Sequence, residues 1–171
     1  WMIGGIWFYL RRELHRPALP EFDHSAPGCS ILIPCYNEEQ HVTETLRFAL
    51  ASRYPNLEVI VINDGSTDNT ADVLNRLAAQ HDRLKVVHLA RNQGKAMALQ
   101  AGSLLAKAEY LIGIDGDALL DPHAAHWMVR HFEQDPSVAA VTGNPRIRTR
   151  TTLLGTLSGD SLPPSIVRSM N

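Results

Sequence analysis

The fold is decided by an apolar run that ends in a polar turn, LEVIVINDGSTD at residues 57–68. The run 57–62 is almost entirely apolar and rich in β-branched residues, which is typical of a strand buried on both faces of a sheet. Ser66, Thr67 and Asp68 are residues that cap the first turn of a helix, and apolar residues follow them at helical spacing. The stretch therefore predicts a buried strand followed directly by a helix.

The same strand-and-helix unit recurs along the chain. Further apolar strands are predicted at 30–34, 84–89, 110–114 and 138–142. Asn37, with Gln40 as its partner, would cap the helix after the first of these. The helix from about Gly94 carries its apolar residues on one face: Met97, Ala101, Leu104 and Leu105. Apolar strands alternating with amphipathic helices predict an α/β fold, a mostly parallel sheet with helices on both faces.

Polar and turn-forming residues gather just beyond the predicted strand ends. Ligands of such sheets bind outside the carboxyl ends of the strands. Helix caps would also place polar residues there, so the pattern alone leaves function and capping open. The residues concerned are Tyr36, Asn37 and Glu38; Asn63, Asp64, Gly65 and Ser66; Arg91 and Asn92; and Asp115, Gly116 and Asp117.

The most specific of these groups is Asp115-Gly116-Asp117, directly after a buried strand. Carboxylates at i and i+2 of an extended segment project to the same side, where they would raise each other's pKa. A hard divalent cation such as Mg²⁺ or Mn²⁺, which prefers oxygen ligands and often shares them with a phosphate, resolves that conflict. Capping of the next segment is the alternative. The pattern favours a divalent metal site.

Two further turns suit a nucleotide. Asp64 can accept hydrogen bonds from a base edge or a ribose, although Asn63–Ser66 could equally be a turn and a helix cap. Gly94 and Lys95 lie at a predicted helix N-terminus, a natural site for an anion. The surroundings do not match a P-loop, because position 89 is Leu where the first Gly would stand.

Composition excludes several classes of protein. Sixteen Lys and Arg against eighteen Asp and Glu in 171 residues give a net charge of −2, which argues against a nucleic-acid partner. Cys29 and Cys35 are too few for a disulfide scaffold, so we interpret them as reduced, buried thiols.

The two ends differ from the middle. Residues 1–12 are apolar and then basic, as at the cytoplasmic end of a transmembrane or membrane-proximal helix, and 13–29 reads as a linker. We therefore expect an inner-membrane protein with its main domain, residues 30–150, in the cytosol. Arg146, Arg148 and Arg150 suit either a charged edge strand or contact with a diphosphate or anionic lipid. Residues 151–171 are predicted to be an irregular tail.

Four motifs in this order and spacing resemble family 2 glycosyltransferases of the GT-A fold, whose nucleotide-binding half is Rossmann-like. They are ILIPCYNEE at 31–39, VINDGSTD at 61–68, NQGKA at 92–96 and IDGD at 114–117. Together with VTGNPR at 141–146 and the membrane-like N-terminus, they look most like bacterial poly-β-1,6-N-acetylglucosamine synthases, with cellulose, chitin and hyaluronan synthases as near relatives.

The resemblance implies inverting, metal-dependent transfer of N-acetylglucosamine from a UDP-sugar donor to a polysaccharide acceptor. Its implied site residues are Pro34, Tyr36 and Glu38 around the uridine, Asp64 on the uracil, Lys95 by the nucleotide, Asp115 by the ribose, diphosphate and metal, and Asp117 on the metal, Mg²⁺ or Mn²⁺. The membrane is an implied partner, and a small membrane subunit is left open as another.

The chain also departs from the family pattern. The family places its general base in a Thr-Glu-Asp motif and holds the acceptor with a Gln-x-x-Arg-Trp motif, and neither occurs in this sequence. We therefore expect a truncated domain that binds the donor and is inactive alone. A non-catalytic nucleotide-sugar-binding remnant is the alternative. A sugar-nucleotide pyrophosphorylase is disfavoured, because residues 34–37 do not form the Gly-rich loop of that class.

Overall fold

The computed structural model describes residues 21–143. The predicted membrane segment 1–12, the first part of the linker 13–29, the three alternating arginines and the tail 151–171 lie outside these residues. The elements, in chain order, are β1 (Cys29–Cys35), α2 (Val42–Leu50), β2 (Leu57–Asn63), α3 (Thr70–Ala78), β3 (Leu84–His88), α4 (Lys95–Leu105), β4 (Tyr110–Gly113) and α5 (Ala124–Gln134). Residues Phe22–Ala125 form one compact unit that contains the whole sheet.

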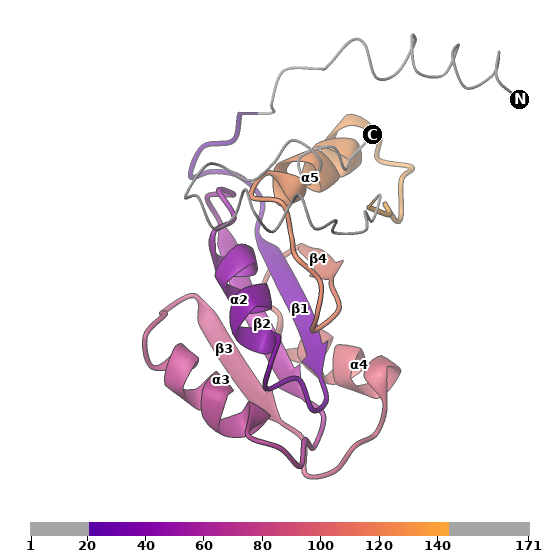
Figure 1. Cartoon of the computed structure of the whole chain (residues 1–171). Helices are drawn as coiled ribbons and strands as arrows, with labels where there is room; N and C mark the ends of the chain where they lie inside the picture. Colours follow the sequence, from indigo (N-terminus) through magenta and orange to yellow (C-terminus); the bar gives the residue numbers. More distant parts are fainter. Residues whose placement is uncertain (1–20, 144–171) are drawn as a thin grey trace, which may run out of the picture. The chain divides into compact units, whose positions relative to one another are not determined.

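The four strands form one parallel sheet in the order β3-β2-β1-β4 (Figure 1), which confirms the predicted α/β class. The two central strands are apolar on both faces, and Ile31, Ile33, Val59 and Val61 have no exposed surface. From β1 the chain builds outward on one side through β2 and β3 and then returns to place β4 on the other side. Such a reversal of strand order is where α/β sheets bind their ligands.

Helices cover both faces of the sheet, as predicted. Ala98 of α4 packs into a cluster with Leu32, Ile60 and Ile62 on one face. The right-handed crossovers that join parallel strands place α2 and α3 over the opposite face (Figure 1). The alternating side chains of β1 and β2 are therefore buried in both directions.

The sequence wrongly predicts which residues of α4 pack against the sheet. Met97, Leu104 and Leu105 are about half exposed or more, and the residues that meet the sheet are Ala98 and Gly102. A Cβ atom on Gly102 would lie 2.6 Å from Cδ1 of Ile62. The helix thus approaches the strands closely through its two smallest buried residues, which an apolar count does not detect.

Three other local predictions are wrong. The helix after β2 has Asn69 at its N-cap, with no side-chain cap, and not Ser66, Thr67 or Asp68. The helix after β1 has His41 rather than Asn37 at its N-cap, and it has no side-chain cap. Asn37 instead takes a left-handed conformation, with φ of 56°, in the loop before the helix. The predicted strand at 138–142 is absent from the described structure, because its backbone has no neighbouring strand with which to pair. Among residues 21–143, no helix is long and apolar enough to span a membrane.

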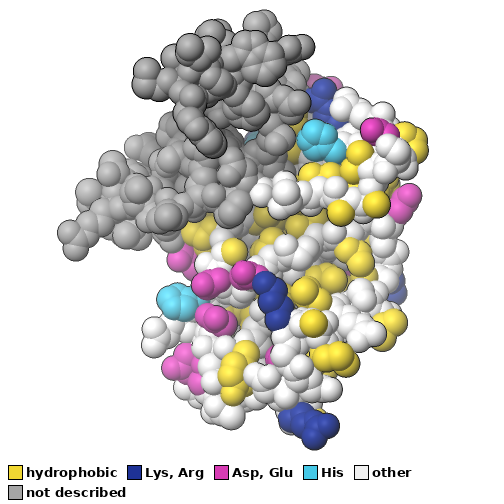
Figure 2. All heavy atoms as spheres, turned by 90° about the vertical axis from the view of Figure 1, so that its right-hand side faces the viewer, with side chains coloured by type: hydrophobic (Ala, Val, Ile, Leu, Met, Phe, Trp, Pro, Cys, Tyr) yellow, Lys and Arg dark blue, Asp and Glu magenta, His cyan; other side chains and the backbone are white. Residues whose placement is uncertain are grey.

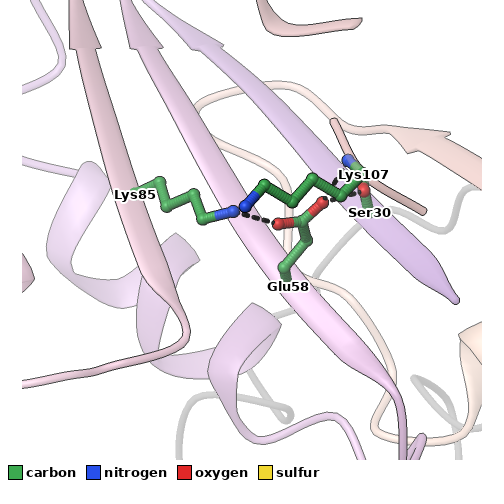
Figure 3. A network of polar contacts seen from close by, with 4 residues as sticks. All are labelled: Ser30, Glu58, Lys85 and Lys107. Carbon is green, nitrogen blue, oxygen red and sulfur yellow. Dashed lines mark hydrogen bonds and ion pairs between the residues drawn. The ribbon is translucent and has the colours of Figure 1, made fainter. Parts of the chain in front are cut away.

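A polar network ties the amino-terminal ends of the strands together (Figure 3). The carboxylate of Glu58 on β2 accepts hydrogen bonds from the Ser30 hydroxyl at 2.6 Å, from the Lys107 backbone N–H at 2.8 Å and from the Lys85 ammonium at 2.5 Å. Partial burial alone would raise the pKa of Glu58, but these hydrogen bonds outweigh it and lower the pKa to about 2. The network stabilises the sheet at the end opposite to its carboxyl edge.

Candidate functional site

The carboxyl ends of the strands bring the predicted site loops to one edge. Directly after β2, the Asp64 N–H donates to the carbonyl of Cys35 at 2.9 Å, so the loops after β1 and β2 start side by side. Directly after β4, the Ile114 N–H donates to the carbonyl of Leu32 at 3.1 Å. The loop that begins at Asp115 therefore starts beside β1 as well.

Hydrogen bonds join two of these loops, residues 36–39 and 66–70, and we call them the paired loops. The Asn37 N–H donates to the Ser66 hydroxyl at 2.9 Å, and the Asn37 side-chain oxygen accepts from the Thr67 N–H at 2.8 Å. Asn tolerates the left-handed backbone that this position requires. Three more hydrogen bonds join the loops: Glu38 N–H to Thr70 Oγ1 (2.9 Å), Glu39 N–H to Asp68 Oδ2 (3.2 Å) and Asn69 N–H to Glu39 Oε2 (3.0 Å).

Asp64 is buried and anchors the loop that precedes α4. Its Oδ1 accepts from the Gln93 N–H at 2.8 Å, and its Oδ2 accepts from the Gly94 N–H at 2.7 Å. The side chain is only 3% exposed. The structure thus brings Asp64 together with the backbone next to Lys95, and it gives this carboxylate a structural task that the sequence did not indicate.

Gly65 allows the loops after β2 and β3 to touch. Its φ is +66°, and a Cβ atom there would lie 2.4 Å from the carbonyl carbon of Arg91 and 2.5 Å from the amide nitrogen of Asn92. No other residue fits without moving one of the loops. The sequence predicts the tight turn at Gly65, but it does not reveal this close approach.

Asp115, Gly116 and Asp117 form a loop after β4 that we call the acidic loop. A buried glycine holds it between two exposed carboxylates. A Cβ atom on Gly116 would lie 3.2 Å from the Pro34 carbonyl, from Cys35 Sγ and from Glu38 Cγ. The buried hydroxyl of Thr45 on α2 donates to the Gly116 carbonyl at 2.8 Å. Sequence reasoning missed Thr45, although a polar residue on the apolar face of a helix is a signal for such a task.

Lys95, the first residue of α4, forms an ion pair with Asp115. Both side chains are more than half exposed, and pairs of this kind contribute little stability, so either partner can exchange for a ligand group. Figure 2 shows the side of the molecule that carries α4, where several acidic side chains gather beside a basic one. The arrangement offers both a cation and carboxylates to a charged ligand.

The acidic loop can supply only some of the ligands that a divalent cation needs. Among residues 21–143, no group of three or more His, Cys, Asp or Glu could hold a metal ion. Asp115 and Asp117 are exposed on either side of Gly116. They lie in a turn, in which the Ala118 N–H donates to the Asp115 carbonyl at 3.0 Å, and not in the extended segment that the sequence predicts. Mg²⁺ commonly takes one or two carboxylates and completes its shell with water and substrate phosphates. The two residues present suit an ion of that kind that binds with its ligand.

The remaining predicted residues lie at the end of β1. Pro34 is half-buried within the strand, Tyr36 follows it with 45% of its surface exposed, and Glu38 is half-buried beside Gly116. Between them, Cys35 is buried, as predicted. Its burial, and secondarily the charge of Glu38, raise the pKa of the Cys35 thiol to about 12, so it is neutral and unsuited to nucleophilic catalysis.

Comparisons with known proteins agree with this architecture. Residues 30–164 match the family model described as Glycosyl transferase family 2. The chain is 40% identical over 158 residues, or 91% of its length, to a poly-beta-1,6-N-acetyl-D-glucosamine synthase of Staphylococcus epidermidis. It is 39% identical over the same length to the Staphylococcus aureus (strain COL) protein of that name. The chain spans 38% of the length of each of these relatives.

Two solved structures have a similar fold. S. aureus TarS 1-349, crystallised in complex with UDP-GlcNAc, superposes with a TM-score of 0.57 at 24% identity, covering 63% of this chain and 31% of TarS. The mannosyltransferase PcManGT from Pyrobaculum calidifontis, in complex with GDP-Man and Mn²⁺, gives 0.58 at 26% identity, covering 91% of this chain and 46% of that enzyme. Together with the family match and the synthase relatives, the parallel sheet and its acidic edge identify this chain as a member of glycosyl transferase family 2.

Proposed function

We propose that this chain forms the donor-binding part of an inverting transferase that moves N-acetylglucosamine from UDP-N-acetylglucosamine to a growing β-linked polysaccharide. The observation that carries the proposal is the convergence of the acidic loop, Lys95 and the paired loops at one edge of the sheet. The identity of 40% to a synthase of poly-β-1,6-N-acetylglucosamine supports the choice of sugar and polymer.

The uridine part of the donor is proposed to bind beside the end of β1. Tyr36 offers an exposed aromatic ring, while Pro34 and Glu38 flank it in the sequence. Asp64 is proposed to contact the uracil. Each of its carboxylate oxygens already accepts one backbone hydrogen bond, and each has a second lone pair with which to accept another.

The diphosphate is proposed to bind beside Lys95 and the acidic loop. The ammonium of Lys95 and the free N–H groups at the start of α4 favour an anion there. Asp115 and Asp117 would hold Mg²⁺ or Mn²⁺, and the complex of PcManGT with GDP-Man and Mn²⁺ supports this assignment. When bound, the ion would neutralise the negative charge that develops on the departing diphosphate.

Transfer with inversion also needs a base that takes the proton of the acceptor hydroxyl. The residues assigned above are all committed to the nucleotide, the metal or loop structure. The proposal for this chain is therefore donor binding, and polymerisation is assigned to it only in combination with groups that hold and activate the acceptor polysaccharide.

We also propose that the protein works at the inner membrane with this domain on the cytosolic side. The support is the apolar stretch within residues 1–12 and the basic residues Arg11, Arg12 and Arg16, since positive charge marks the cytoplasmic end of membrane segments. The polymer acceptor and a small membrane subunit are the partners proposed there.

The test is binding of radiolabelled UDP-N-acetylglucosamine by equilibrium dialysis with and without Mn²⁺. We expect Mn²⁺-dependent binding, lost on chelation, and a decrease in affinity of about tenfold or more in Asp117→Asn, since a metal ligand is removed. Asp82→Asn, which removes an exposed carboxylate in a turn away from the edge, is the matched control and should bind normally. Equal affinity in all three proteins would contradict the assignment. Sugar transfer, followed in the same samples, tests for activity beyond donor binding.

A further inference from the structure

A short relay of polar side chains connects three elements behind the paired loops. Asn63, the last residue of β2, lies opposite His88, the last residue of β3, in the parallel register. The Asn63 side-chain nitrogen is 3.0 Å from Nδ1 of His88, and Nε2 of His88 is 2.9 Å from the side-chain oxygen of Asn75 on α3. We call Asn63, His88 and Asn75 the histidine relay. None of the roles assigned above uses it.

The relay determines the protonation state of His88. The side-chain oxygen of Asn63 is already taken by the Ser66 N–H at 3.0 Å, so the amide must turn its NH₂ group toward His88. Nδ1 of His88 therefore accepts, and Nε2–H donates to Asn75. Only the neutral imidazole with its proton on Nε2 satisfies both contacts. In a charged imidazolium, an N–H would face the N–H of Asn63.

The relay continues into the donor site. Ser66, whose N–H is held by Asn63, accepts a hydrogen bond from the Asn37 N–H through its hydroxyl at 2.9 Å. Asn37 lies between Tyr36 and Glu38, the residues assigned to the uridine. If His88 is charged, the Asn63 amide must rotate or withdraw, and the Ser66 N–H then loses its acceptor. The shape of the paired loops thus depends on a histidine outside them.

The segments around His88 carry few charged residues. His88 is exposed, and on its side of the sheet β2 offers Val59, Val61 and Asn63, none of them ionisable. The charged residues of neighbouring segments are Asp72 and Arg76 on α3 and Arg91 after β3, all exposed. Among the described residues, no ion pair involves any of the three.

We propose that His88 is a positioning residue for the sugar-nucleotide site: neutral His88 holds the paired loops in their binding shape through Asn63, and protonation of His88 weakens donor binding. This inference rests on the proposed function for its binding readout. Because histidine is the side chain that gains a proton on mild acidification, the weakening is expected when the pH falls from 7.5 to 5.5.

The experiment uses calorimetry to compare the affinity for UDP-N-acetylglucosamine at pH 7.5 and 5.5. The diphosphate diester of this ligand does not titrate in this range. The wild-type chain is expected to lose about fivefold in affinity at the lower pH, the size of a weak coupling between linked sites. His88→Gln can accept from Asn63 and donate to Asn75 at any pH, so it should keep its affinity. Asn75→Asp, which places a carboxylate beside Nε2, should shift the loss to higher pH. His81→Gln, at an exposed position in the turn before β3, is the matched control and should behave as the wild type.

A second readout does not depend on ligand. The Ser66 amide signal in NMR spectra of the free chain should shift on acidification in the wild type and stay fixed in His88→Gln. Equal pH dependence of affinity in these two proteins, or a Ser66 signal that titrates equally in both, would overturn the role of His88. Failure of the wild type to bind the donor at pH 7.5 would instead contradict the proposed function, and the Ser66 signal would still test the relay.

Discussion

The carboxylate of Asp64, one residue beyond β2, accepts a hydrogen bond of 2.7 Å from the backbone N–H of Gly94, one residue before α4. The contact joins two segments 30 residues apart and orients the start of the helix whose first residue is Lys95. An acidic side chain at this position therefore holds the backbone that leads into α4. Both of its oxygens take part, one accepting from Gln93 and the other from Gly94.

We expect Asp64→Asn to lower the free energy of unfolding by about 1 kcal/mol, because the amide NH₂ cannot accept from a backbone N–H and one of the part-buried hydrogen bonds to Gln93 and Gly94 is lost. Urea unfolding measures the change. Asp82→Asn, which removes an exposed carboxylate, is the control and should change stability by less than about 0.5 kcal/mol. An Asp64→Asn protein as stable as the control would show that the contact with the Gly94 loop is dispensable.

Gly65→Ala should destabilise the protein more than Gly94→Ala. Both glycines have positive φ, +66° and +90°, so both substitutions carry a backbone cost of about 1 kcal/mol. Only at Gly65 does the new Cβ meet backbone, at 2.4 Å, whereas nothing lies within 4 Å at Gly94. We expect Gly65→Ala to cost at least about 2 kcal/mol in urea unfolding. Equal losses in the two variants would rule out the close approach to Arg91.

The Glu58 network should make stability depend on acid pH in a defined window. Because the pKa of Glu58 is lowered to about 2 in the folded protein, its contribution is complete above the ordinary pKa near 4.5 and is lost as the pH falls toward 2. We expect Glu58→Gln to be less stable than the wild type by about 2 kcal/mol at pH 7, with the gap closing between pH 4.5 and 2. Thermal unfolding across this range measures the gap, and a gap that does not change with pH would contradict the prediction.

Thr45→Val tests the support of the acidic loop. Valine keeps the shape of threonine but cannot donate to the Gly116 carbonyl, so we expect a loss of about 1 kcal/mol in unfolding free energy. A looser loop should also weaken Mn²⁺-dependent donor binding. Thr43→Val, on the exposed side of the same helix, is the control and should leave both unchanged. Unaltered donor binding in Thr45→Val would mean that Asp115 and Asp117 are positioned by other contacts.

The sequence predicts the sheet well and the contacts between loops poorly. Strands such as Leu57–Asn63 are apolar on both faces, so composition alone locates them and implies their parallel pairing. It also places Asp64, Lys95 and Asp115 at one edge, because that follows from strand direction. The task of Thr45 and the left-handed turn at Asn37 depend on residues distant in the chain, which no local pattern encodes.

The same limit explains the errors. The apolar face of α4 is misassigned because Gly102 and Ala98 meet the sheet through lack of bulk rather than through hydrophobicity. The segment 138–142 has the composition of a strand, but a strand also needs a neighbour, and none pairs with it in the described structure. Strand propensity thus predicts a strand correctly only where the sequence also implies the neighbours with which that strand pairs.

The hydrogen bonds between the two paired loops have an evolutionary consequence. Since Asn37, Ser66 and Thr67 share hydrogen bonds across the two segments, the effects of substitutions in one segment will not add to those in the other. A change tolerated in one background will be harmful in another, so these positions are expected to diverge in concert rather than one at a time.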